Sequence, residues 1–192
     1  LYDYQEALDM AFAKIEQNQV VSSWKDSMVS GRFKRSLNKY KKVPSYGCLK
    51  DAQQLETSDA AAALERIWSI GGKNGYYYAN FLWKIRGAVD KLFGGVGLRR
   101  GRTNADKIYA GDALDFWRVL VADKEEKRLL LFAEMKVPGE AWLEFEIDEH
   151  NVVHQTATFR PRGLWGRLYW YSMLPFHYFI FSGMIRHIAT GK

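Results

Sequence analysis

The chain contains very little cysteine and proline for its length. One cysteine, Cys48, and 4 prolines occur among 192 residues. A single cysteine excludes a disulfide within the chain and a zinc site made of several cysteines, and it is typical of proteins from a reducing compartment. No secretory signal precedes the first helical pattern. We therefore expect a cytoplasmic protein that folds without disulfides.

Grouped catalytic and metal-binding residues are also missing. His154 and His177 each stand alone, without a carboxylate or a second histidine at the spacing of metal ligands, so no metal site is predicted. No Ser-His-Asp or Cys-His arrangement is apparent. The sequence consequently names no catalytic residue, predicts no cofactor for this part of the protein, and leaves open whether the chain is an enzyme.

The chain has an excess of positive charge. There are 28 lysines and arginines against 22 aspartates and glutamates, which gives a net charge of +6. Such an excess suits anionic partners. The basic residues, however, lie in short scattered groups with no recognisable nucleic-acid motif beside them. Nucleic acid is therefore not predicted as a partner.

Aromatic residues are abundant, and the C-terminal segment concentrates them. Hydrophobic residues make up 47% of the chain and aromatic residues 15%. Residues 164–185 contain one full charge, Arg167, and one histidine, His177. Such a segment has no polar face wide enough for an ordinary surface helix. We therefore expect it to be buried, either by the rest of the chain or by a lipid bilayer.

Apolar spacing predicts three helices and one strand in the first half of the chain. Residues 4–17 form an amphipathic helix, residues 47–56 a strand, and residues 60–70 a helix capped by Ser58 or Asp59. Basic, polar residues up to Pro44 indicate a linker. A further helix spans residues 78–93, and its predicted core face contains Phe81, Leu82, Ile85, Val89, Leu92 and Phe93.

From residue 113 onward the apolar period changes from 3.6 to 2. Four strands are predicted, at residues 113–122, 127–136, 141–147 and 152–159. The loops between them are short enough for hairpins, so the sheet is predicted to be antiparallel. Residues 149–151 form the last of these loops.

Turn positions predict which residues face each other across the strands. A two-residue turn at Pro138 and Gly139 sets Glu134 opposite Leu143, and a turn at residues 124–127 sets Asp115 opposite Lys136 and Trp117 opposite Glu134. The predicted core face then contains Trp117, Val119, Val121, Leu130, Phe132, Leu143, Phe145, Ile147, Val153, Ala157 and Phe159.

The opposite face of this sheet is predicted to be wet. It carries Arg118, Glu144 and Glu146, and Arg118 is expected to reach over Ala133 to Glu144 in a weak surface ion pair. The apolar face needs a cover, and only the C-terminal segment is apolar enough to provide one. The sequence thus predicts an α+β fold in which a curved antiparallel sheet wraps a long C-terminal helix, with two helices after the first strand.

This order of elements is similar to the helix-grip architecture of the START-like, or SRPBCC, superfamily. More specifically, the chain resembles a bacterial family of unknown function, DUF2867. The resemblance rests on five motifs over about residues 46–190, namely IWSIGGKNGYYYANFLWKIRG (67–87), GVGLRRGR (95–102), GDALDFWRV (111–119), AEMKVPGEAWLEFE (133–146) and QTATFRPRGLWGRLYWYSMLPFH (155–177).

The resemblance also implies a domain organisation. In that family the domain often follows an NAD-binding domain of the short-chain dehydrogenase type, so residues 1–45 are interpreted as the tail of such a domain with a linker, and residues 46–190 as the helix-grip domain. The chain begins with Leu1, and we expect it to be a fragment of a longer protein. NAD(P) would then be a cofactor of the upstream domain. The resemblance supplies no catalytic residues.

Our leading hypothesis is that a hydrophobic or amphipathic small molecule binds between the sheet and the C-terminal helix. Ligand pockets are mostly apolar with a few convergent polar groups. The predicted walls are Trp117, Phe132, Phe145, Phe159, Tyr169 and Phe176, and the predicted polar groups are Asp115, Glu134, Lys136, Gln155 and His177. The alternative for two of these is that Asp115 and Lys136 form a cross-strand ion pair at the open end of the sheet.

Two other functional hypotheses remain open at this point. The chain could be a structural module that only buries aromatic surface and positions the upstream domain. It could also be a membrane protein, because residues 164–185 reach the length of a bilayer span. Arg167, Pro175 and four strands left without a cover argue against the span.

Overall fold

The computed structural model describes residues 3, 38–95, 97, 102 and 107–192. The predicted helix at residues 4–17 and most of the predicted linker lie outside this part of the chain. The described elements are α2 (Asn38–Lys41), β1 (Leu49–Glu56), α3 (Ala60–Trp68), α4 (Asn80–Leu92), β2 (Ala113–Leu114), β3 (Trp117–Asp123), β4 (Arg128–Ala133), β5 (Gly139–Ile147), β6 (Val152–Pro161) and α5 (Gly163–Thr190).

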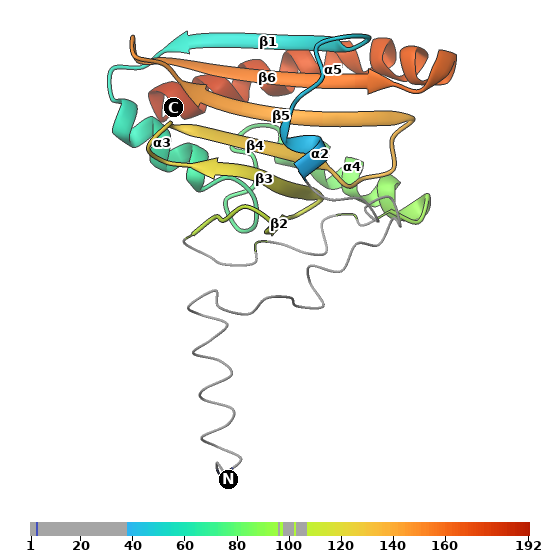
Figure 1. Ribbon diagram of the computed structural model, residues 1–192, viewed down its shortest axis with the longest axis horizontal. Coiled ribbons are helices and arrows are strands. Elements are labelled where there is room, and N and C mark those ends of the chain that lie inside the picture. Colours follow the sequence, from blue (N-terminus) through green and yellow to red (C-terminus); the bar gives the residue numbers. More distant parts are fainter. Residues whose placement is uncertain (1–2, 4–37, 96, 98–101, 103–106) are drawn as a thin grey trace.

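The strands form one antiparallel sheet with the order β1-β6-β5-β4-β3-β2. Helices α3, α4 and α5 lie on one face of this sheet, and the short α2 lies on the other (Figure 1). The long helix α5 packs against β6 and β1 and also contacts α3. The predicted α+β architecture, with a C-terminal helix on an antiparallel sheet and two helices after the first strand, is confirmed.

Local signals explain where the helices begin and end. The Asp59 carboxylate accepts a hydrogen bond from the Ala62 backbone N–H at 2.9 Å, which satisfies a free donor in the first turn of α3. Helix α5 ends at Thr190 and is capped by Gly191, whose φ of 76° is favoured by glycine. Pro175 lies inside α5 without ending it.

The predicted pairing of β3 with β4 is correct at the turn and wrong further along. Asp123 pairs with Arg128, as the predicted turn requires, but the register shifts between Val119 and Val121. Beyond this β-bulge Trp117 faces Ala133 and not Glu134. Because side chains alternate between the faces of a strand, one extra residue moves the following side chains to the other face.

The predicted pairing of β4 with β5 is also wrong. Leu131, not Glu134, lies opposite Leu143. Residues 134–138 leave the β4–β5 ladder, because the Glu134 N–H donates to the Phe116 carbonyl oxygen and the Lys136 N–H donates to the Asp90 carboxylate. The connection is therefore a five-residue loop rather than a two-residue turn. The three-residue loop predicted at residues 149–151 is consistent with the observed pairing of Ile147 with Val153.

These shifts redistribute the predicted core residues over two clusters. The main core lies between the sheet and the three helices and includes Leu129 and Leu131 together with Trp117, Val119, Leu143, Phe145, Ile147, Val153, Ala157 and Phe159. The opposite face is not wet as predicted, because a second apolar cluster forms there against α2. It contains Tyr40, Leu120, Leu130, Phe132 and Trp142, with Val121 packed against it.

Helix α4 presents a different face to the sheet from the predicted one. Its buried residues are Trp83, Gly87 and Asp90. Asp90 is held inside because its carboxylate accepts hydrogen bonds from the N–H groups of Gly97 and Lys136. Phe81 and Leu92, which the pattern assigns to the core, are 59% and 83% exposed.

Helix α5 is buried along only part of its surface. Its C-terminal half packs into the core through Ile180, Phe181, Met184, Ile185 and Ile188. The expectation that the whole segment is buried is wrong for its N-terminal half, which exposes large apolar side chains. Within the described part of the chain, no helix is long and apolar enough to cross a membrane.

Candidate functional site

A cavity of about 330 Å³ lies between the sheet, α4 and α5. This volume falls at the lower end of the range for small-molecule sites. The sheet and its β4–β5 loop contribute the floor, with Trp117, Met135, Val137, Ala141, Ala157 and Phe159. The two helices form the sides, and the cavity is open between them because Ile85 of α4 and Phe176 of α5 line it and are about half exposed.

Helix α5 contributes an aromatic wall. The Phe159 and Trp170 rings stack with centroids 5.7 Å apart, and the Trp170 and His177 rings form a T-shaped contact with centroids 5.0 Å apart. His177 in turn contacts the Phe181 ring at 4.9 Å. All four residues line the cavity. Their contacts fix the shape of this wall, because ring pairs add stabilisation beyond the area they bury.

Among the described residues, Arg86 is the only fully charged one in the lining. It is half-buried on α4, and among the described residues its guanidinium has no carboxylate or other hydrogen-bond partner. Asp90, one turn further along α4, is already bound by two backbone N–H groups. A half-buried cation without a protein partner is a group that an anionic ligand can pair with.

Besides Arg86 and Tyr169, the described lining contains one more ionisable residue, His177. Burial lowers the pKa of His177 below its ordinary value, and the charge of Asp51 opposes this only in part. The imidazole is therefore neutral at neutral pH. Its Nδ1 atom is buried and makes no hydrogen bond to any described residue.

Two tryptophans of the lining also have buried indole N–H groups without a hydrogen-bond partner among the described residues. These are Trp83 and Trp117. The Trp117 indole lies near the Tyr76 hydroxyl, but the two groups do not meet the geometry of a hydrogen bond. A buried donor without a partner costs roughly 1–3 kcal/mol. The site thus holds polar groups that an acceptor could still satisfy.

Five of the predicted site residues line the cavity. They are Trp117, Phe159, Tyr169, Phe176 and His177. Two others, Phe145 and Gln155, lie on the same face of the sheet but not in the lining. Gln155 is 1% exposed, and both polar atoms of its side chain lack a hydrogen-bond partner within the described structure.

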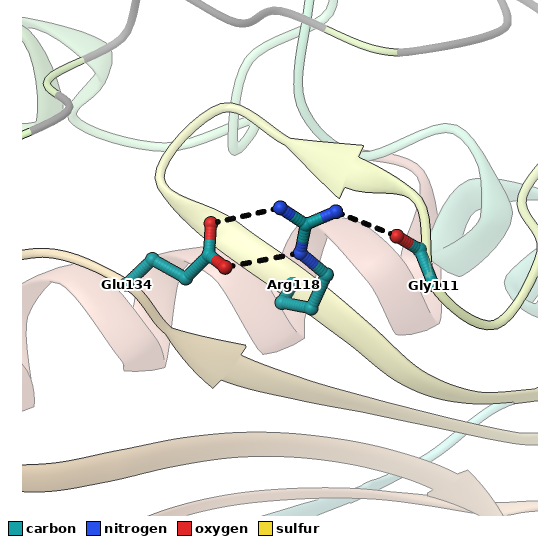
Figure 2. A network of polar contacts seen from close by, with 3 residues as sticks. All are labelled: Gly111, Arg118 and Glu134. Atoms are coloured by element: carbon teal, nitrogen blue, oxygen red, sulfur yellow. Dashed lines mark hydrogen bonds and ion pairs between the residues drawn. The ribbon is translucent and has the colours of Figure 1, made fainter. Parts of the chain in front are cut away.

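Phe132 and Glu134 lie on the opposite face of the sheet, which corrects the prediction that they line a cavity under α5. Glu134 is 3% exposed and forms a two-point ion pair with Arg118, with nitrogen–oxygen distances of 3.0 and 3.3 Å. The third guanidinium nitrogen of Arg118 donates to the Gly111 carbonyl oxygen at 2.7 Å (Figure 2). The predicted Arg118–Glu144 pair is therefore wrong, and Glu144 pairs with Arg128.

Asp115 does not face Lys136, because the predicted strand at residues 113–122 folds into a hairpin with Asp115 in its turn. Asp115 has a φ of 52°, which favours small polar residues such as Asp. Its carboxylate accepts hydrogen bonds from the Tyr76 hydroxyl at 3.1 Å and the Gly72 N–H at 3.2 Å. Burial raises the pKa of Asp115, and these hydrogen bonds oppose the rise.

The hydrogen bond between Asp115 and Tyr76 holds a ring that packs against the lining residue Trp83. Burial raises the pKa of Tyr76 well above its ordinary value, so the hydroxyl remains a donor. The Tyr76 ring stacks on Trp83 with centroids 4.3 Å apart. Asp115 thus helps to position a wall residue without lining the cavity. Lys136 is exposed in the β4–β5 loop, between the lining residues Met135 and Val137.

Sequence reasoning missed Arg86 and Trp83, because both belong to α4. The pattern placed the apolar stripe of this helix against the core, and the inward face was found only in the structure. The spacing of Trp83, Gly87 and Asp90 at i, i+4 and i+7 is a helical signal for that face. Asp90 lies on this face, however, and a charged residue in a helical pattern normally indicates a solvent-facing side.

The fold and the cavity define a class of protein, an α+β domain in which an antiparallel sheet and two helices enclose an apolar pocket. The chain belongs to DUF2867, a family of proteins of unknown function whose model matches residues 48–184. The family resemblance carried by the motifs is thereby confirmed. No curated protein and no solved structure matches the chain.

Proposed function

We propose that this chain binds a hydrophobic or amphipathic small molecule in the cavity between the sheet, α4 and α5. One observation carries the proposal: the lining is apolar and aromatic except for Thr158, His177 and a half-buried arginine, Arg86, which has no partner in the described structure. This combination of apolar walls with few polar groups is typical of ligand sites. Trp117, Phe159, Tyr169 and Phe176 supply walls, and Arg86 favours a ligand with an anionic head.

The wider setting is also a proposal. We place the domain in the START-like superfamily, which the order of its elements supports. We further propose that it serves as an accessory to an upstream NAD(P)-binding domain of the same polypeptide in the cytoplasm. The motif resemblance supports the upstream NAD(P)-binding domain, and the low cysteine content supports the cytoplasm.

Displacement of anilinonaphthalene sulfonate, a fluorescent amphipathic anion, tests the cavity, and native mass spectrometry reveals a co-purified ligand. Ala157 lines the cavity with a small side chain, so Ala157→Phe fills part of the space. We expect this variant to lose dye binding. Ala52→Phe is the matched control, since Ala52 is an exposed strand residue that does not line the cavity.

The outcome distinguishes ligand binding from a purely structural role. Dye that binds the parent chain and Ala52→Phe equally, but not Ala157→Phe, supports the proposal. If the folded parent chain binds neither dye nor any lipophile, or if Ala157→Phe binds dye as well as the parent does, the cavity is not a ligand site. Near-ultraviolet circular dichroism establishes that each variant is folded.

A further inference from the structure

Residues 164–179 of α5 carry an exposed apolar stripe. Its members are between 50% and 79% exposed, and they are Leu164, Trp165, Leu168, Tyr171, Tyr178 and Phe179. Their spacing places them on one side of the helix, pointing away from the sheet. Three of the six are Trp or Tyr, which have an apolar body and a polar tip. We call this set the outer stripe.

Helix α4 extends the apolar surface across the mouth of the cavity. Phe81, Ile85 and Leu92 are 59%, 55% and 83% exposed. The Tyr78 ring, just before α4, contacts the Phe179 ring of the outer stripe with centroids 5.1 Å apart. Exposed apolar surface on this scale marks an interaction site more often than a free surface.

The charge on these two helices has a single sign. They contain five basic residues, Lys84, Arg86, Lys91, Arg167 and Arg186, and one acidic residue, Asp90. Asp90 is 1% exposed and bound by the Gly97 and Lys136 N–H groups. Every charged side chain that α4 and α5 present to solvent is therefore positive.

We propose that α4 and the outer stripe of α5 dock on the surface of an anionic lipid bilayer. An interfacial helix combines an apolar face rich in Trp, Phe and Leu with Lys and Arg, and both elements are present. Trp and Tyr favour the boundary between lipid headgroups and acyl chains. A second copy of this chain is a poorer occupant, because a symmetric contact through the same surface would bring the five cations together.

This docking would turn the mouth of the cavity toward the lipid. Ile85 and Phe176 line the cavity and are also 55% and 48% exposed, so they belong to both surfaces. A lipophilic molecule could then enter from the bilayer without crossing water. The docking itself does not depend on the ligand proposed above, because the outer stripe lies outside the cavity.

Co-flotation of the 192-residue chain with vesicles tests the proposal. We expect binding to phosphatidylcholine vesicles that contain phosphatidylserine, weak binding to phosphatidylcholine alone, and release at high salt. The double variant Trp165→Ser/Phe179→Ser should lower the partition coefficient about tenfold or more. Arg167→Gln and Lys84→Gln should each lower it about fivefold. Tyr46→Ser is the control, because Tyr46 is 96% exposed in the turn before β1 and should have no effect.

Three results would overturn the docking proposal. The first is a folded chain that binds neither kind of vesicle. The second is a dimer that dissociates in the double variant, which would make the stripe a contact between copies. The third is loss of vesicle binding in Ala157→Phe, which would place the lipid in the cavity. Dye binding that fails while vesicle binding persists would overturn the ligand proposal alone.

Discussion

Arg118 and Glu134 form a buried two-point ion pair. The predicted register instead sets Trp117 opposite Glu134 and places Arg118 on the other face of the sheet. The pair exists because the bulge near Leu120 moves the start of β3 by one residue relative to β4. Both side chains are almost completely shielded from solvent. Such a pair contributes little net stability, but breaking it is costly, because one buried charge is then left without its partner.

Arg118→Met is therefore expected to lower the free energy of unfolding by about 3–5 kcal/mol. The double variant Arg118→Met/Glu134→Leu removes both charges, and we expect it to recover most of that loss. Guanidinium unfolding curves of the two variants provide the measurement. Arg128→Met is the control, because the Arg128–Glu144 pair is partly exposed and should contribute below about 1 kcal/mol. Equal loss in the single and double variants would contradict this account.

A methyl group at Gly166 should separate the start of α5 from the β4–β5 loop. A Cβ atom at this position would lie 2.5 Å from the Pro138 carbonyl oxygen and 2.9 Å from Pro161 Cα. The Pro138 oxygen already accepts a hydrogen bond from the Arg162 N–H, so it cannot simply move away. We expect Gly166→Ala to cost about 1–3 kcal/mol, more than the helix propensity that alanine gains.

Thermal unfolding measures this effect, and Ser172→Ala provides the comparison. Ser172 is exposed on the same helix, so its replacement should change stability by less than about 0.5 kcal/mol. If Gly166→Ala is as stable as Ser172→Ala, the close approach of α5 to Pro138 does not constrain the helix.

The sequence was sufficient for the architecture because period-2 strands, short loops and one very apolar helix allow few arrangements. It could not provide the register of every strand. The run from Val119 to Ala122, where the bulge lies, is apolar at consecutive positions, so it does not specify which side chains face the core. A bulge adds one residue without a turn residue or a charge to mark it.

Only part of the site could be predicted, because the strand register and the orientation of α4 decide which side chains face the cavity. Tyr169, Phe176 and His177 were found because they lie on the helix that covers the sheet. Trp117 was found because the bulge leaves it on the core face, and Phe159 because the predicted register of β5 with β6 is correct. Glu134, assigned to the core face only by the incorrect register, was misplaced. Arg86 was missed because the orientation of α4 depends on hydrogen bonds from distant backbone groups to Asp90, which no periodicity records.

His177 should make the protein less stable at mildly acidic pH. Its pKa in the folded state lies below the ordinary value of 6.5 because the ring is buried. At higher pH the folded and unfolded states both hold a neutral ring. As the pH falls below 6.5, the unfolded chain takes up a proton first, so stability is lost until the pH passes the pKa of the folded state.

The variant His177→Phe keeps a ring between Trp170 and Phe181 and removes this titration. We expect its melting temperature to fall less than that of the parent chain between neutral pH and about pH 5. Melting curves at a series of pH values measure the difference. Parallel curves for the two proteins would show that the folded chain accepts a proton at His177 as readily as the unfolded chain does.

Arg86 should select ligands by the charge of the head group. A hydrogen bond to a charged group contributes about 1.5–3 kcal/mol. Arg86→Gln should therefore lower the affinity for a fatty acid by about 10- to 100-fold. The affinity for the corresponding fatty alcohol should stay nearly unchanged, because its tail still contacts the same walls. Lys84→Gln is the control, since Lys84 is exposed on the same helix and does not line the cavity. Isothermal titration with both lipophiles decides the matter, because equal weakening of acid and alcohol would mean that Arg86 only shapes the cavity.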